Sequence, residues 1–235
     1  MVLQLDGVYV LGQAQDGNCP GLEIKSAVLY PQNSPQNRWM LADRCSAEDF
    51  LGLVAGLLEK AAVQPHDVLI GLGDGALWIE NIFNHLGAKR ITDVFHACEY
   101  LETIMLALDW DEATRLEHRK RLCNGHVNVR NWLADFLPSP VIWLDWDDTA
   151  QGALQYLETR LASMAYADFA KRGWPIGSGQ VEAMNKAVIG KRLKQSGMHW
   201  SELGAAGMAS LRAQICARNS LVDLDSLRFD AFAFS

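Results

Sequence analysis

Residues 66–87 read HDVLIGLGDGALWIENIFNHLG and decide the fold class, because a buried strand in them runs directly into a helix. Val68–Leu72 form a near-continuous apolar run, which is typical of a strand that is covered on both faces of a sheet. The run ends at Gly73-Asp74-Gly75, a turn signal, and the apolar spacing beyond it predicts a helix over residues 76–86. This combination indicates an α/β protein.

Outward from this segment, the sequence predicts further strands on both sides. Three short runs precede it between turn-rich segments, so we expect an antiparallel meander at residues 3–12, 22–30 and 38–45. A helix with clear apolar spacing follows at residues 46–62, and a short strand is expected at residues 90–94. The resulting order, β-β-β-α-β-α-β, is that of the ribonuclease H-like fold.

This strand order predicts a meeting of acidic side chains. The first and fourth strands of such a sheet are neighbours, so Asp6 and Asp74 are expected within a few ångströms of each other. Two carboxylates at that separation repel each other unless a divalent cation lies between them. A third acid must come from a helix packed on the sheet, and Glu182 is the candidate.

Glu182 lies in an unusually basic stretch, residues 171–200, KRGWPIGSGQVEAMNKAVIGKRLKQSGMHW. This stretch has six basic side chains and one acid, whereas the whole chain has a net charge of −7. The concentration of positive charge predicts an anionic ligand.

The same stretch reads as a loop that leads into a helix. Breakers at Trp174-Pro175 and Gly177-Ser178-Gly179 precede a helix that starts near Gly179, with Ser178 as a possible N-cap, and continues to Lys194. The expected core face carries Val181, Met184 and Val188, and the opposite face carries Glu182, Lys186 and Lys194.

Each acidic residue also has a purely structural interpretation. Glu182 and Lys186 could form an ordinary i,i+4 ion pair on a surface helix. Asp6 could be a strand-edge acid that faces water, and Asp74 a turn or N-cap residue. Asp93 could cap the helix that begins after the last strand, and His96 could be a hydrogen-bonded core histidine.

The remaining chain is mainly helical. Residues 99–170 are expected to form an all-helical insertion, interrupted by PSPVIWLDWDD, in which Val141–Leu144 are not assigned. Residues 1–98 are expected to form the first part of the core. Residues 171–220, with another helix at 201–219, complete the core, and residues 221–235 form a tail.

Composition limits the function classes. The chain has 235 residues, 49% of them hydrophobic, which suffices for a full core. Because no apolar run reaches a membrane span of roughly 18 residues and no leader is evident, we expect a cytoplasmic protein without membrane contact. Its five cysteines, without a CxxC pair, are expected to be reduced thiols. The acidic total argues against a self-sufficient nucleic-acid binder but permits an enzyme with a carboxylate site.

Four segments together, LQLDG, GLGDGALWI, DVFHACEYL and GWPIGSGQVEAMNKAVIGKRLKQSGMHW, resemble the DDE-type transposases of bacterial insertion sequences, in the group related to the Mutator transposases. The resemblance spans about residues 3–218. It implies a ribonuclease H-like core with a helical insertion before the final acid. It also implies DNA recombination: cleavage of DNA at the element ends and transfer of the freed 3′-hydroxyl to target DNA, with two Mg²⁺ or Mn²⁺ ions.

The resemblance also implies roles for individual residues. Asp6, Asp74 and Glu182 match the three catalytic, metal-binding acids. Asp93 and His96 match an accessory signature of the group. The expected DNA-binding residues are Lys186, Lys191, Arg192 and Lys194.

Members of this family carry an N-terminal region that recognises the element ends and generally act as oligomers. Here the first acid is already at residue 6, so we expect a chain that lacks that region. Sequence-specific recognition by this chain alone is therefore not expected, whereas DNA and a second copy of the chain remain the expected partners.

Two other functions are open at this stage. The chain could be an inactive remnant that binds DNA weakly or contacts another protein, or a metal nuclease of the same fold that acts on RNA–DNA hybrids or junctions. Within the insertion, Trp110, Trp143 or Trp146 could stack on a flipped base. The strip Glu117–Arg121 could be a DNA track, but a solvated helix face is the more common role of such a charge run.

Overall fold

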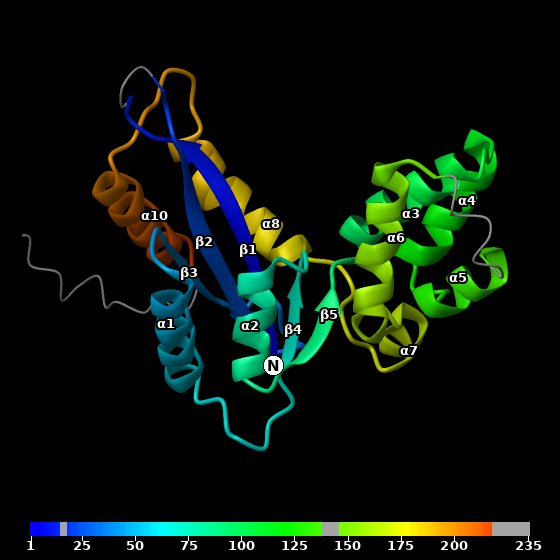
Figure 1. The fold of residues 1–235 in the computed structure, drawn as a ribbon. Coiled ribbons are helices and arrows are strands. Elements are labelled where there is room, and N and C mark those ends of the chain that lie inside the picture. The colour runs from blue at the N-terminus through cyan, green and yellow to red at the C-terminus, as the bar shows by residue number, and fades with distance from the viewer. Residues whose placement is uncertain (15–17, 138–145, 218–235) are drawn as a thin grey trace, which may run out of the picture. The chain divides into compact units, whose positions relative to one another are not determined.

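The computed structural model describes residues 1–14, 18–137 and 146–217 (Figure 1). The protein is α/β, with a five-stranded mixed sheet in the order β3-β2-β1-β4-β5 and flanking helices. It divides into two compact units. Unit 1 comprises Met1, residues 6–67 and residues from 180 onward, and unit 2 comprises residues 2–5 and 68–179.

The meander predicted at the N-terminus is present in unit 1. β1 (Val2–Leu11) is followed by β2 (Gly21–Tyr30) and β3 (Trp39–Asp43), and β2 pairs antiparallel with β3. α1 (Ala47–Lys60) begins where the sequence predicted, because the Ser46 side chain accepts a hydrogen bond from the backbone N–H of Asp49 at 3.0 Å. α10 (Glu202–Cys216) packs on β3 and β2.

One correction concerns the helix expected from Gly179 to Lys194. The structure has α8 (Gly179–Asn185), then one π-helical turn, η3 (Lys186–Gly190), then the short α9 (Lys191–Leu193). Arg212 of α10 donates to the carbonyl oxygens of Ala187 at 2.7 Å and Val188 at 2.8 Å. These bonds satisfy backbone acceptors in a turn that departs from the regular α-helical pattern.

Unit 2 contains the parallel part of the sheet. β4 (Ile70–Gly73) pairs with the start of β1, with Gln4 opposite Leu72, and with β5 (Lys89–Thr92) on its other side. α2 (Leu77–His85) follows β4, as predicted. The strand expected at residues 90–94 ends earlier, at Thr92, because Asp93 caps α3 (Val94–Ala107).

The described part of the predicted insertion is helical. After α3, which begins before residue 99, the chain forms α4 (Glu112–Cys123), α5 (Val129–Phe136), α6 (Asp148–Arg160), the 3₁₀ turn η2 (Leu161–Ser163) and α7 (Tyr166–Lys171). Val141–Leu144 and the tail at 221–235 lie outside the described residues.

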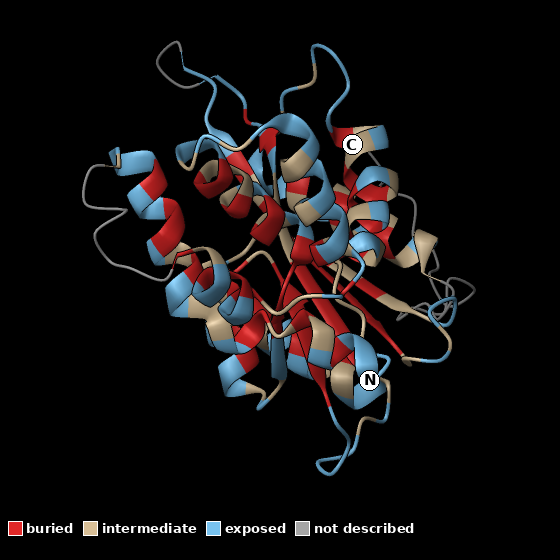
Figure 2. Cartoon of the chain, turned by 90° about the vertical axis from the view of Figure 1, so that its right-hand side faces the viewer, coloured by how far each residue is buried: buried red, intermediate tan, exposed pale blue. Residues whose placement is uncertain are grey.

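The core follows the predicted apolar faces. The central strands are largely buried (Figure 2), and Val181, Met184 and Val188 of the basic stretch are buried as expected. Among the helices of the described residues, none combines the length and apolarity that a membrane crossing requires.

Candidate active site

Asp6 is held by a hydrogen-bond chain within unit 1. Its Oδ1 accepts from the backbone N–H of Gly7 at 2.8 Å, and its Oδ2 accepts from Nδ2 of Asn185 in α8 at 2.7 Å. The Asn185 side chain is buried, and its Oδ1 accepts from the hydroxyl of Ser26 in β2 at 2.6 Å. Asp6 is half-buried and oriented, so it is not an acid that merely faces water at a strand edge.

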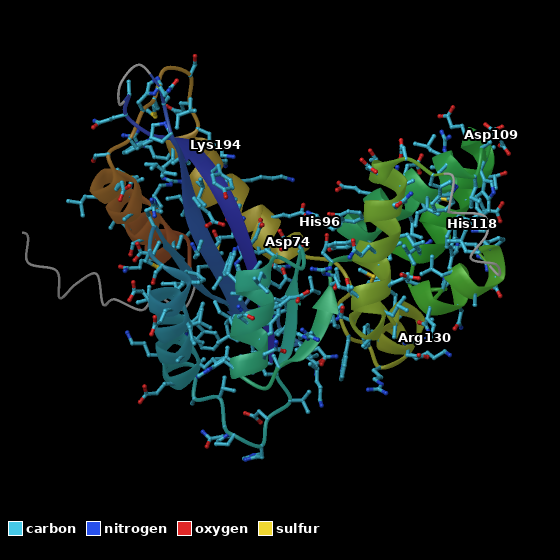
Figure 3. All side chains as sticks on the ribbon, viewed as in Figure 1. Asp74, His96, Asp109, His118, Arg130 and Lys194 are labelled. Atoms are coloured by element: carbon cyan, nitrogen blue, oxygen red, sulfur yellow. The ribbon has the colours of Figure 1, made fainter. Side chains whose placement is uncertain are left out.

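Asp6 and Glu182 line the same cavity, whose volume is about 250 Å³. The cavity belongs to unit 1 and is lined by Asp6, Val8, Glu182, Asn185, Lys186, Gly190 and Lys194. Two predicted acids and two predicted DNA-binding lysines are therefore brought together. Figure 3 marks Lys194, which follows α9 directly.

The ordinary ion pair proposed for Glu182 is also present. Nζ of Lys186 lies 4.0 Å from Oε2 of Glu182, with 42% of the Glu182 side chain exposed. An exposed pair at this distance contributes little to stability. Glu182 is therefore accessible from solvent while it lies beside a positive charge.

The other predicted basic residues, Lys191 and Arg192, are not among the residues that line this cavity. Lys191 is exposed. Arg192 lies over the Trp200 ring, with its guanidinium carbon 5.7 Å from the ring centroid, and its Nη1 is 3.6 Å from Sδ of Met198. Arg192 thus stabilises the segment that follows α9.

Asp74, in unit 2, has the turn role foreseen for it. Its Oδ1 accepts from the backbone N–H of Ala76 at 2.8 Å, two residues ahead, which is an Asx turn before α2 (Figure 3). Its carbonyl oxygen accepts from the Tyr156 hydroxyl, and Arg160 donates to the carbonyl of Gly75 at 3.0 Å. Gly75 has φ +88°, which favours glycine there.

Asp93 and His96 form a second polar centre in unit 2. Asp93 is fully buried. Its Oδ1 accepts from the backbone N–H of Ser178 at 2.8 Å, and its Oδ2 accepts from the backbone N–H of His96 at 3.3 Å and lies 3.0 Å from His96 Nδ1. The predicted capping role of Asp93 is confirmed.

His96 is not a core histidine, because 44% of its side chain is exposed. The hydrogen bond to Asp93 raises the pKa of His96 to about 9, against the opposing effect of burial, and the charges of Asp93, Asp74 and Glu99 add to the increase. His96 therefore carries a positive charge at neutral pH.

Two of the three acids of the predicted metal site, Asp6 and Glu182, line one cavity of unit 1. Carboxylate oxygens suit Mg²⁺ and Mn²⁺, so the donor chemistry of Asp6 and Glu182 fits these ions. Across residues 1–14, 18–137 and 146–217, no three His, Cys, Asp or Glu side chains form a group that could hold a metal ion.

Sequence reasoning missed Asn185, although a signal was present. Asn185 lies four residues after Val181, and so falls on the apolar face of α8. A polar side chain at a core position needs a buried partner, which here is Asp6 on one side and Ser26 on the other.

The base-stacking candidates in the insertion have different outcomes. The Trp110 ring packs 5.6 Å from Trp132 and 5.0 Å from Phe136, so it belongs to an aromatic cluster. Trp143 lies outside the described residues, and Trp146 lines a cavity beside α3 and α6. In the strip Glu117–Arg121, His118 contacts the aromatic cluster and the other residues are exposed, as on a solvated helix face.

Comparison with models of known families finds no match for this chain, and a comparison with curated proteins finds none either.

Proposed function

We propose that this protein is the catalytic domain of a DDE-type DNA transposase, which cleaves DNA strands and transfers the 3′-hydroxyl end to target DNA. The observation that carries the proposal is the cavity that Asp6 and Glu182 share with Lys186 and Lys194. Carboxylates that can bind divalent cations, beside lysines that can bind phosphates, are what phosphodiester chemistry requires.

The sheet supports a ribonuclease H-like fold. Its order, β3-β2-β1-β4-β5, combines an antiparallel β2-β3 pair with parallel pairing of β4 to β1 and β5, which is compatible with that fold. Gln4 pairs with Leu72, and the acids Asp6 and Asp74 each follow two residues later. Asp74, in unit 2, is included as the second acid because the resemblance of the segment GLGDGALWI to the family assigns it that role.

The side chains have distinct roles in this proposal. Two Mg²⁺ or Mn²⁺ ions, when bound, would supply activation of the attacking hydroxyl and stabilisation of the leaving oxygen. Gly7 and Asn185 orient the Asp6 carboxylate, and Lys186 and Lys194 bind the DNA phosphates. The charged His96 contributes a further phosphate contact. Such enzymes act on paired DNA ends, so we propose a homo-oligomer in the cytoplasm.

The test uses DNA with a free 3′-hydroxyl at a pre-cleaved end and Mn²⁺. We expect metal-dependent strand cleavage or joining, and a loss on the order of a thousandfold or more in each of Asp6→Asn, Asp74→Asn and Glu182→Gln. Asp109→Asn is the matched control, because Asp109 is an exposed acid with φ +56° and asparagine tolerates this conformation. Activity that survives in all three acid variants would contradict the proposal.

One observation favours a second candidate, an inactive remnant that binds DNA weakly or contacts another protein. Glu182 pairs with Lys186 as an ordinary helix-surface residue does. This candidate predicts no Mn²⁺ binding that depends on the three acids, which calorimetric titration of wild type and the triple variant measures. A metal nuclease of the same fold is distinguished by its preference for RNA–DNA hybrids over DNA.

A further inference from the structure

A second cavity lies in unit 1, with a volume of about 290 Å³. Its lining is largely apolar and comprises Tyr9, Val10, Leu11, Gly21, Leu193, Lys194, Gln195 and Met198. Lys194 also lines the cavity that contains Asp6 and Glu182. The two cavities are therefore neighbours that share one positive charge.

Part of the lining of the second cavity, Lys194, Gln195 and Met198, comes from the segment Lys194–Trp200, KQSGMHW. The backbone N–H of Trp200 donates to the carbonyl of Leu11 at 2.9 Å, and the N–H of Gln13 donates to the carbonyl of Trp200 at 2.9 Å. The Trp200 indole N–H donates to the carbonyl of Leu193 at 3.0 Å. These bonds fix the segment against the end of β1. The part of the cavity lining that it supplies is therefore held by hydrogen bonds.

The lining of the second cavity also includes an aromatic ring, that of Tyr9. Tyr9 of β1 is 61% exposed, and its ring lies against Gly21 of β2. A Cβ atom at Gly21 would be only 3.2 Å from Cδ1 of Tyr9, so a larger residue there would displace the ring. Glycine thus leaves room for an aromatic surface that remains accessible from the cavity.

We propose that this cavity binds an unpaired nucleobase of DNA, stacked on Tyr9, next to the phosphate bound in the acidic cavity. A base can stack its π face on the Tyr9 ring and contact the polarizable Met198 thioether. Its polar edge can form hydrogen bonds with the Gln195 amide. The phosphate of the same nucleotide would pair with Lys194. The cluster of Lys191, Arg192 and Lys194 complements the charge of a nucleotide but not that of an uncharged apolar ligand.

This inference rests on the proposed function, because it takes DNA as the ligand of the neighbouring cavity. It differs from the idea of base stacking on tryptophans in the insertion, since it assigns the role to Tyr9 and to the segment Lys194–Trp200. It also gives that segment a purpose: it closes the base site beside the acids.

The test compares the affinities of the whole chain for two single strands, oligothymidylate about 12 nucleotides long and an abasic strand with the same number of phosphates. EDTA is present and the salt concentration is fixed. We expect wild type to prefer the strand with bases by about fivefold to a hundredfold. Tyr9→Leu should abolish the preference, and Tyr9→Phe should retain it.

Two controls separate stacking from other effects. Lys194→Ala should lower the affinity for both strands by the same factor, because it removes a phosphate contact. Leu203→Ala, which truncates an apolar side chain that is 88% exposed in α10, should change neither affinity. Equal binding of the two strands by wild type, or an unchanged preference in Tyr9→Leu, would overturn the proposal.

Because binding is measured without metal, the outcome is independent of catalysis. A base preference that depends on Tyr9 in a chain without strand cleavage would leave the base site standing and remove the transposase proposal. Cleavage that depends on Asp6, in a chain without base preference, would support the transposase proposal and remove the base site.

Discussion

Asp6 in unit 1 and Asp93 in unit 2 are both held by hydrogen bonds, but their surroundings differ. Asp93 is fully buried, and both of its oxygens accept from backbone N–H groups, those of Ser178 and His96. Asp6 is half-buried, is oriented by the Asn185 amide, and lines a cavity of about 250 Å³. The Asp93 carboxylate is buried and occupied by hydrogen bonds within the fold, whereas the Asp6 carboxylate is oriented at the edge of a cavity.

This difference shows how a structural acid can be told from a candidate catalytic one. A carboxylate that satisfies backbone donors at a chain junction contributes to stability, and its replacement leaves those donors unpaired. A carboxylate that is oriented by a side chain, and that also lines a cavity, can exchange partners with a ligand. The comparison predicts that Asp93 matters most for stability and Asp6 most for activity.

The largest effect on stability is expected for Asp93→Ala. The substitution removes the cap of α3 and leaves the buried Ser178 N–H without its acceptor, so we expect the free energy of unfolding to fall by about 2–4 kcal/mol. Asp147→Ala is the matched control, because Asp147 caps α6 in the same unit with an exposed side chain. Its expected cost is about 1 kcal/mol. Chemical denaturation measures both variants. Equal losses of unfolding free energy in Asp93→Ala and Asp147→Ala would contradict the special structural role of the buried acid.

A smaller effect is expected for the hydrogen-bond chain behind Asp6. Asn185→Ala leaves the Asp6 carboxylate and the Ser26 hydroxyl without their shared partner, so a cost of about 1–3 kcal/mol is expected. Ser26→Ala should cost about 1 kcal/mol. The double variant should cost less than the sum, by about 0.5 kcal/mol or more, because the hydroxyl has already lost its acceptor in Asn185→Ala. If the two losses of unfolding free energy were strictly additive, the hydrogen bonds from Ser26 through Asn185 to Asp6 would be energetically independent of each other.

The sequence predicted the described elements well wherever one periodicity was strong. The buried run before Gly73 and the amphipathic α1 are examples, since each pattern has a direct physical cause. The end of β5 was placed too late because Val94 is apolar and β-branched, yet Asp93 caps a helix in front of it. Local propensity alone could not decide whether Val94 continues the strand or begins the helix.

The site was less accessible to sequence reasoning, because its geometry depends on residues far apart in the chain. Spacing placed Glu182 and Lys186 on one helix face, and the cavity contains both. The link from Ser26 through Asn185 to Asp6 spans three elements, so no local pattern reveals it. The π turn after Asn185 is likewise hydrogen-bonded by a distant residue, Arg212 of α10.

The smallest expected effect is a pH dependence of stability that arises from His96. Its folded pKa of about 9 lies above the unfolded value of about 6.5, so its contribution is fully present below pH 6.5 and is lost as pH rises through 9. The difference in unfolding free energy between wild type and His96→Gln should therefore shrink over this window. His118 provides a contrast of opposite sign (Figure 3), because burial lowers its pKa and its Nδ1 accepts from the Trp132 indole. For His118→Gln the difference should shrink as pH falls below 6.5. Parallel pH profiles for the two variants would contradict the assignment of His96 as a charged partner of a buried acid.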